Sequence, residues 1–182
     1  RLLGLRRRSR AVPPHRVLAR YGRGDASDPL VLKRQYAVES EPGIQVLVSL
    51  YGPPHPHVAP PRGHLEVYLG HVSGQTDVQQ VPEVRERAKA GRPFLVVDPR
   101  GLGQSLPDTC NATDPFGPYA GDFLYASTGE MLGESYLGRR VHDVLAVLDW
   151  LRANGAGRTD LSGRGFGAVI AAFAGLLHPS RP

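Results

Sequence analysis

The 182-residue chain has few of the residue types that point directly to a function class. It contains a single cysteine, Cys110, so an internal disulfide is excluded and the redox compartment stays open. No apolar run approaches the ~20 residues that a membrane-spanning helix needs, and the start lacks the apolar region of a signal peptide. The only methionine is Met131 and the chain begins with Arg1, which we interpret as a fragment or a processed product.

Positive charge is concentrated near the start of the chain. Residues 1–25 hold eight arginines against one aspartate, a local +7, so the other 157 residues sum to −2 within the formal net charge of +5. We therefore expect a basic extension over residues 1–30 and a single domain over 31–182. The extension is either a solvated tail or a contact for nucleic acid or an anionic surface. It lacks the interleaved aromatics that stack on single-stranded bases, so nucleic acid is not the expected partner.

Hydrophobic patterning predicts an order of strands and helices typical of an α/β fold. A short helix is expected around residues 17–21, and two β-rich runs at 31–38 and 44–50 flank a Pro-Gly turn, which predicts a hairpin. After a proline-rich connection, the expected strands are 65–69, 94–97 and 159–162, and the expected helices are 81–90, 132–151 and 168–177. This alternation predicts a parallel sheet.

Three details complete this prediction. We expect residues 70–77 to be an exit loop and residues 105–120 to be a long surface excursion, because both are rich in turn-forming residues. The helix at 168–177 is apolar on every side, so we expect the rest of the fold to cover it.

The most informative motif is a glycine-spaced turn before the last expected helix. Gly163, Gly165 and Gly167 have the spacing of a strand-to-helix nucleophile elbow, in which the middle residue presents its hydroxyl above a sheet. Here the middle residue is Gly165, which has no side chain. Sterics still explain the flanking glycines, because a sharp turn between strand and helix has no room for a Cβ. The motif predicts an elbow that has kept its shape without its nucleophile.

A second motif follows the strand at 94–97 and reads Asp-Pro-Arg-Gly-Leu-Gly-Gln-Ser over residues 98–105. Its glycines, Gly101 and Gly103, allow a tight turn at the carboxyl end of a strand. Asp98 and Arg100 can satisfy loop backbone groups or each other, so we expect a structural role for them. A catalytic Asp98 would need a partner histidine that the local sequence does not offer.

Together these motifs resemble the α/β-hydrolase superfamily, and within it the acetyl xylan esterase, dienelactone hydrolase and prolyl-oligopeptidase-like branches. The similarity covers residues 32–179 and rests on the 98–105 run, the helix end at 144–151 and the glycine elbow. It implies a three-layer α/β sandwich with a mainly parallel sheet. The chain would hold the N-terminal part of that fold and would be incomplete at its C-terminal side.

The resemblance also implies roles for particular positions. Gly165 stands at the nucleophile position, and the backbone N–H of Phe166 is one donor to a bound oxyanion. The second donor is expected in the loop at Val72 and Ser73. The family's acid and histidine lie on later strands, past Pro182, so nucleophile, base and acid are all lacking at their expected positions.

Other residues are weighed as replacements for the missing groups. Ser162, inside the strand before the elbow, is the fallback nucleophile, and Ser73 is another, with neighbouring His71 as its base. Ser135 is expected to cap a helix. The histidines at positions 55, 57, 64 and 71 invite a metal site, but no cysteine or acidic cluster accompanies them, so we expect neither a metal nor another cofactor.

These observations support three classes of function. The first is an esterase-like hydrolase acting on carboxylic esters, such as acylated carbohydrate, with the missing groups supplied by a homodimer or a C-terminal half. The second is a non-catalytic hydrolase-like scaffolding or binding module, of the kind that large bacterial esterase-like proteins carry. The third is a basic protein that binds anions through its tail. We expect a soluble protein, cytoplasmic or exported from a bacterium, and no feature of the sequence selects the compartment.

Overall fold

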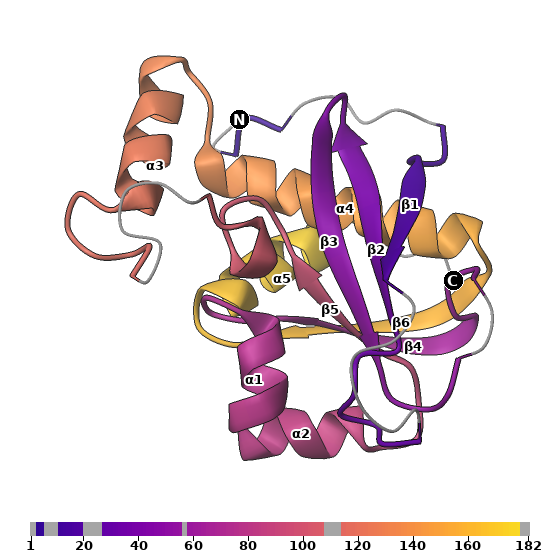
Figure 1. Cartoon of the computed structure of the whole chain (residues 1–182). Coiled ribbons are helices and arrows are strands. Elements are labelled where there is room, and N and C mark those ends of the chain that lie inside the picture. Colours follow the sequence, from indigo (N-terminus) through magenta and orange to yellow (C-terminus); the bar gives the residue numbers. More distant parts are fainter. Residues whose placement is uncertain (1–2, 6–10, 20–26, 56–57, 108–113, 179–182) are drawn as a thin grey trace.

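The computed structural model describes residues 3–5, 11–19, 27–55, 58–107 and 114–178. Six strands form one sheet in the order β1-β2-β3-β5-β4-β6 (Figure 1). The strands are β1 (His15–Ala19), β2 (Arg34–Glu41), β3 (Ile44–Tyr51), β4 (Gly63–Leu69), β5 (Phe94–Asp98) and β6 (Ala156–Gly163). The helices are α1 (Gly74–Gln80), α2 (Pro82–Ala88), α3 (Gly121–Met131), α4 (Tyr136–Ala153) and α5 (Phe166–Leu177), with a 3-10 turn, η1 (Gly103–Ser105).

Several expectations concern segments that the structure does not describe. Most of the arginine-rich start, Cys110 and His57 lie outside the described residues. Within the described part of the chain, no helix is long and apolar enough to cross a membrane.

The sheet is mixed, and the expectation of a mainly parallel sheet is wrong. Strands β1, β2, β3 and β5 pair antiparallel in turn, and only β5, β4 and β6 run parallel. The reason lies in the connections. The Pro42-Gly43 turn, with Gly43 at φ +79°, joins β2 directly to β3 as the predicted hairpin. Parallel neighbours need a crossover, and here α1 and α2 carry the chain from β4 back to β5.

The expected helix at residues 17–21 is also wrong over its described part, because residues 17–19 belong to the edge strand β1; residues 20 and 21 lie outside the described residues. Val17 lies opposite Tyr36 of β2, so a strand from the first thirty residues is part of the sheet. The segment is too short for the spacing of its apolar residues to distinguish a helix from a strand. It forms a strand because the edge of β2 offers it backbone partners.

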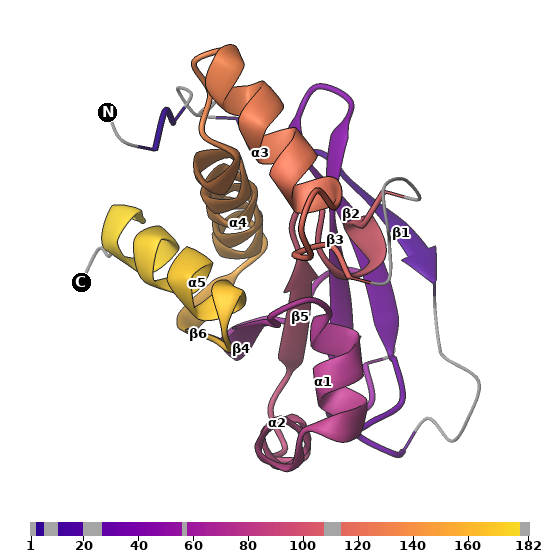
Figure 2. The ribbon, with the colours of Figure 1, turned by 90° about the vertical axis from the view of Figure 1, so that its left-hand side faces the viewer.

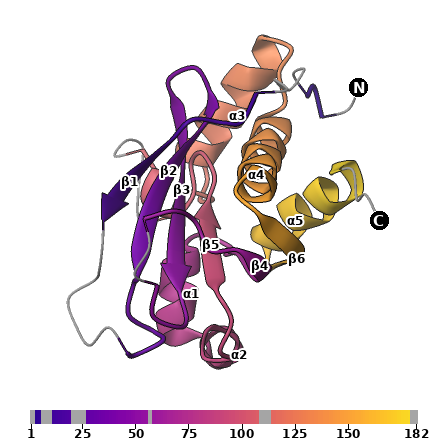
Figure 3. The same cartoon turned by 90° about the vertical axis from the view of Figure 1, so that its right-hand side faces the viewer.

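Helices cover both faces of the sheet, as Figures 2 and 3 show. On one face α4 and α5 pack against alternate strand residues, including Leu65, Val67 and Leu95. On the other face Val78 of α1 and Val84 of α2 pack against the strand residues that point the opposite way. These include Tyr68 of β4 and Phe94 and Val96 of β5. Because β5 is buried on both faces, it reads as an apolar run in the sequence, whereas β4 carries the buried Glu66, which pairs with Arg87 and Arg92.

The helices differ from expectation at three places. The expected exit loop at 70–77 is wrong in its second half, because Ser73 caps α1 and the helix begins at Gly74. Helix α3, which was not expected, begins directly after the expected surface excursion at 105–120, and it projects from the body of the molecule (Figure 1). The expected helix at 132–151 begins only at Tyr136, because Gly133 has φ +72° and Ser135 caps the helix, as predicted for that serine.

Candidate functional site

The glycine elbow forms the corner between β6 and α5. Gly165 has φ +55° and ψ −126°, a backbone conformation that residues with a side chain rarely adopt. A Cβ at Gly163 would lie 2.6 Å from the carbonyl oxygen of Gly167, and one at Gly167 would collide with the carbonyl oxygens of Leu69 and Gly70. The two flanking glycines are therefore required by backbone packing, as the sequence predicts.

The corner lies at the carboxyl edge of the parallel strands. Gly163 pairs in register with Leu69 of β4, and the N–H of Arg164 donates to the carbonyl of Leu69 at 3.0 Å. The end of β6 therefore lies beside the loop that leaves β4, residues 70–73. The crevice at this edge is the usual place for ligands in α/β sheets.

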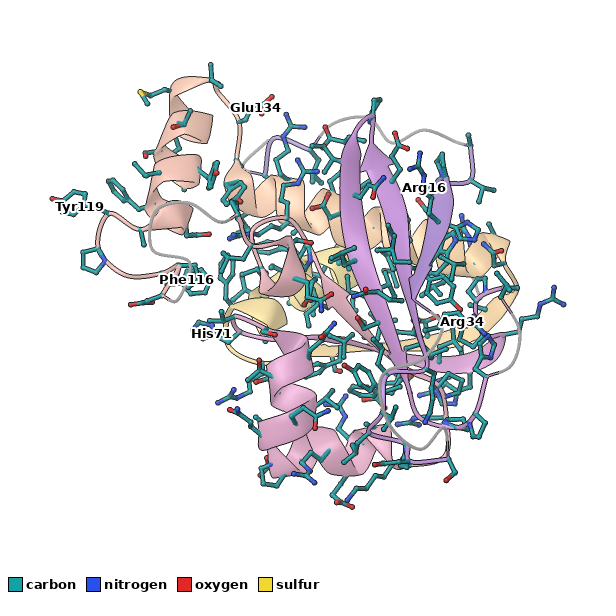
Figure 4. All side chains as sticks on the ribbon, in the orientation of Figure 1. Arg16, Arg34, His71, Phe116, Tyr119 and Glu134 are labelled. Carbon is teal, nitrogen blue, oxygen red and sulfur yellow. The ribbon has the colours of Figure 1, made fainter. Side chains whose placement is uncertain are left out.

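The side chain of His71 fills the space above the corner. The N–H of Phe166 donates to His71 Nδ1 at 3.1 Å, so the proton of the neutral imidazole lies on Nε2. A Cβ added to Gly165 would lie 2.8 Å from that same Nδ1. Phe116 stacks on the imidazole with ring centroids 5.0 Å apart and meets Phe166 edge-on at 5.5 Å. Figure 4 shows His71 and Phe116 side by side at the start of α5.

This arrangement changes the chemistry of the corner. A free N–H at the start of a helix is a donor for a developing oxyanion. Here that donor is already bonded to an imidazole nitrogen, and the residue beneath it has no hydroxyl. The corner therefore presents the Nε2–H of His71 in place of a nucleophile and an open donor.

The two residues expected at the second oxyanion donor serve structural roles. The carbonyl of Val72 accepts the N–H of Gly103 at 2.6 Å. Ser73 Oγ accepts the N–H of Thr76 at 3.3 Å and thereby caps α1. A hydroxyl that caps a helix is held on the backbone, which accounts for a serine at this position without a nucleophilic role.

The fallback nucleophile lies on the wrong face of the sheet. Ser162 pairs in register with Tyr68, which belongs to the core beneath α1 and α2 and not to the α5 side. Its Oγ donates to the carbonyl of Val67 at 3.3 Å and accepts from Arg87 Nη2 at 2.5 Å. These contacts hold the hydroxyl away from the corner.

Asp98 is buried and organises the loop after β5. Its carboxylate is 2% exposed and accepts the N–H groups of Gly74 and Gln104, the latter at 3.1 Å. Burial raises the pKa of Asp98 to about 6, although the two N–H groups act in the opposite direction. Gly103, at φ +54°, lies directly against the carboxylate, where no Cβ would fit. Asp98 thus ties the end of β5 to the starts of α1 and η1.

The partners of Arg100 come from elements distant in sequence. Its Nη2 lies 2.5 Å from Asp143 Oδ1 of α4 and 2.9 Å from Glu41 Oε1 of β2. Burial would raise the pKa of Glu41, but the hydrogen bond from Arg100 and the charges of Arg100 and Arg139 hold that pKa below its ordinary value. Arg100 makes these contacts instead of the ion pair with Asp98 that was one of the expected alternatives. The neighbouring Gly101, at φ +71°, approaches the side chains of Tyr136 and Arg140.

A cavity of about 420 Å³ adjoins the corner. Its walls come from the N-terminal segment, from α3, from the turn before α4, from α4 itself and from Phe166, and they comprise Gly4, Asp122, Ala126, Glu130, Gly133, Glu134, Ser135, Tyr136, Leu137, Arg140 and Phe166. Glu134, one of these residues, is labelled in Figure 4. Another cavity, of about 240 Å³, lies away from the corner between residues 11–14, the end of β2 and α4.

Arg140 joins this cavity to the corner. Its side chain is 1% exposed, pairs with Asp122 Oδ1 at 2.5 Å and donates from Nε to the carbonyl of Arg100 at 2.9 Å. Its guanidinium lies over the rings of Tyr136, at 4.2 Å, and Phe166, at 5.2 Å. Sequence reasoning missed Arg140 and Asp122, because a charge within a helix is ordinarily a solvated one.

The three described histidines of the expected metal site, His55, His64 and His71, do not converge. His64 Nε2 lies 2.7 Å from Asp160 Oδ2, His55 Nε2 lies 2.7 Å from the carbonyl of Ala59, and His71 lies at the corner. Among the residues placed in the structure, no three histidine, cysteine or acidic side chains are grouped to hold a metal ion.

Comparison with solved structures shows a related fold. A protein described as an acetyl xylan esterase from Bacteroides fragilis matches with a TM-score of 0.63 at 15% identity, over 90% of this chain and 45% of the other. The esterase Est1E from Butyrivibrio proteoclasticus, solved with ferulic acid, matches with a TM-score of 0.45 at 15% identity, over 76% of this chain and 45% of the other. The chain thus spans about half the length of these proteins. No protein-family model and no curated protein matches it.

Proposed function

We propose that this chain is an esterase-like module that binds a small ester or acylated carbohydrate without hydrolysing it. The observation that carries the proposal is the state of the corner: Gly165 offers no hydroxyl, and His71 occupies the N–H of Phe166. Ester hydrolysis of the elbow type needs both an activated nucleophile and free oxyanion donors. The fold similarity to a protein described as an acetyl xylan esterase supports the choice of an ester or acylated carbohydrate as ligand.

The cavity beside the corner has the chemistry to hold such a ligand. Tyr136 and Phe166 offer aromatic surface, and the carboxylates of Glu130 and Glu134 can accept hydrogen bonds from sugar hydroxyls. Asp122 and Arg140 neutralise one another, so the wall between cavity and corner carries no net charge. A volume of about 420 Å³ lies within the range of small-molecule sites.

Hydrolysis is tested with p-nitrophenyl acetate on three proteins: the unmodified chain, Gly165→Ser and Gly165→Ala. The two variants are matched, because each adds a Cβ at the same positive φ and against the same imidazole of His71, and they differ only by a hydroxyl. The backbone strain costs about 1–3 kcal/mol in both. We expect all three to release nitrophenol at the rate of buffer. Turnover by the unmodified chain contradicts the proposal, and turnover by the serine variant alone shows that the corner is not blocked.

Binding is tested by calorimetry with acetylated xylobiose. Ala126→Trp fills the cavity, whereas Thr128→Trp places the same side chain on an exposed position of the same helix, α3. We expect saturable binding to the unmodified chain, weakened about tenfold or more by the first variant and unchanged by the second. Equal affinities for both variants, or no saturable heat with the unmodified chain, contradict the cavity as the ligand site.

A further inference from the structure

Strand β6 leaves one edge of the sheet open. It is the last strand in the order and pairs with β4 on one side only, so its outer row of backbone N–H and C=O groups has no strand partner among the described residues. Proteins usually protect such an edge with proline, a bulge, a short strand or a covering element. β6 is eight residues long and contains no proline, and its one register shift against β4 lies between Ala156 and Thr159, so residues 159–163 pair regularly. Its open edge is therefore suited to pairing with another strand.

The helix next to this edge has an uncovered apolar face. α5 contains no polar side chain, and the expectation that the fold covers it is wrong: Val169 is 42% exposed, Leu176 82% and Leu177 41%. The small residues Ala168 and Ala172 are also exposed, which allows a second helix to approach closely. An apolar helix face beside an open strand edge is typical of a protein interface.

We propose that β6 pairs antiparallel with β6 of a second copy of this chain, about a two-fold axis through Thr159. The charges on the strand select this occupant and this register. Arg158 is 75% exposed and Asp160 33% exposed, and the two flank Thr159. An axis at Thr159 places Arg158 opposite Asp160 of the partner subunit, and by symmetry the same pair forms a second time.

The two charges lie on a common face of the sheet, as this pairing requires. Asp160 lies 2.7 Å from His64 of β4 and 3.9 Å from Arg92, which follows α2, so it is on the α2 side. Arg158 reaches the same side, because its Nε lies 2.9 Å from Asp160 Oδ1 within the same chain. Directly opposite charges of unlike sign stabilise an antiparallel pair.

The position of α5 fits the same pairing. The two α5 helices then lie on the same face of one continuous sheet, next to the axis, where their exposed apolar residues can cover one another. One pairing thus removes both the open edge and the exposed helix face.

The association is measured by sedimentation velocity over a wide range of protein concentration. We expect a dimer for the unmodified chain and a dissociation constant raised about tenfold or more by Arg158→Asp or by Asp160→Arg, because each sets like charges opposite one another. The double variant R158D/D160R restores unlike pairs, so we expect its affinity to return toward that of the unmodified chain. Arg152→Asp is the control, because Arg152 is 55% exposed but lies on α4.

A second pair of variants tests the helix face. Leu176→Glu introduces a charge beside the axis, whereas Met131→Glu makes the same change at a residue of similar exposure, 79%, on α3. We expect dissociation with the first and none with the second. Thermal unfolding followed by Trp150 fluorescence verifies that each variant is folded, because this sole tryptophan is fully buried.

Each outcome of these experiments either supports or overturns the proposed dimer. Charge-dependent dimerisation that the double variant rescues supports the proposal. A monomer at every concentration overturns it, and so does a dimer that neither charge reversal nor Leu176→Glu weakens. The proposal does not depend on ligand binding at the corner, so a failed ester or sugar assay leaves this test unchanged.

Discussion

The buried carboxylate of Asp98 makes the stability of this protein depend on pH in an unusual direction. Its pKa of about 6 in the folded state lies above the ordinary value of 3.8, because burial disfavours the charged form. The folded state therefore binds this proton more tightly than the unfolded state does. Between about pH 4 and pH 6 stability falls as pH rises, and above that range the loss is constant. The difference between the two pKa values corresponds to a change of about 3 kcal/mol in the free energy of unfolding.

Asp98→Asn removes this ionisation. The amide loses some hydrogen bonding to Gly74 and Gln104, which lowers stability by an amount that does not depend on pH. The difference in unfolding free energy, variant minus unmodified chain, should therefore increase by up to about 3 kcal/mol from pH 4 to pH 7. Other titrating groups, including Glu41 and His142, are common to both proteins and cancel in this difference.

The assay is urea unfolding followed by Trp150 fluorescence at several pH values. Asp160→Asn is the control of opposite sign: hydrogen bonds from His64 and Arg158 lower the pKa of Asp160, so its contribution is present above pH 4 and is lost only as pH falls further. A stability difference between Asp98→Asn and the unmodified chain that stays constant from pH 4 to pH 7 would refute the reasoning.

Two further predictions concern packing and a buried ion pair. Gly167→Ala should destabilise the chain by about 3 kcal/mol, because its Cβ would meet backbone carbonyls. Gly175→Ala on the same helix places its Cβ in open space and should stabilise the chain by about 0.5–1 kcal/mol. Urea unfolding measures both changes. Asp143→Ala should cost about 3–5 kcal/mol, because it leaves the guanidinium of Arg100 without its α4 partner; a cost below 1 kcal/mol would show that Glu41 alone suffices.

Local sequence patterns predicted the elements that depend on local interactions. The β2–β3 hairpin follows from alternating apolar residues around Pro42-Gly43, and α2 begins at Pro82 as expected. The glycine elbow was predicted from spacing alone, because a turn between strand and helix excludes a Cβ wherever it occurs.

The patterns did not predict the features that depend on which edge or face is free. The antiparallel pairing of β3 with β5 and the conversion of residues 15–19 into an edge strand are decided by available sheet edges, which no local window contains. The short α1 and the projecting α3 were missed because they begin among residues that also suit loops.

The sequence by itself determined that residue 165 has no side chain and that residue 163 must be glycine, since a Cβ there would meet Gly167 in the same turn. The glycine at 167 is required by the carbonyls of Leu69 and Gly70, which only the tertiary structure brings near. Only the tertiary structure decided what occupies the corner. His71 reaches it from the loop after β4, Phe116 from the loop before α3 and Arg140 from α4, and their contacts with Phe166 span 95, 50 and 26 positions of the chain. Burial and hydrogen bonding between such distant residues arise only when the sheet brings their elements together.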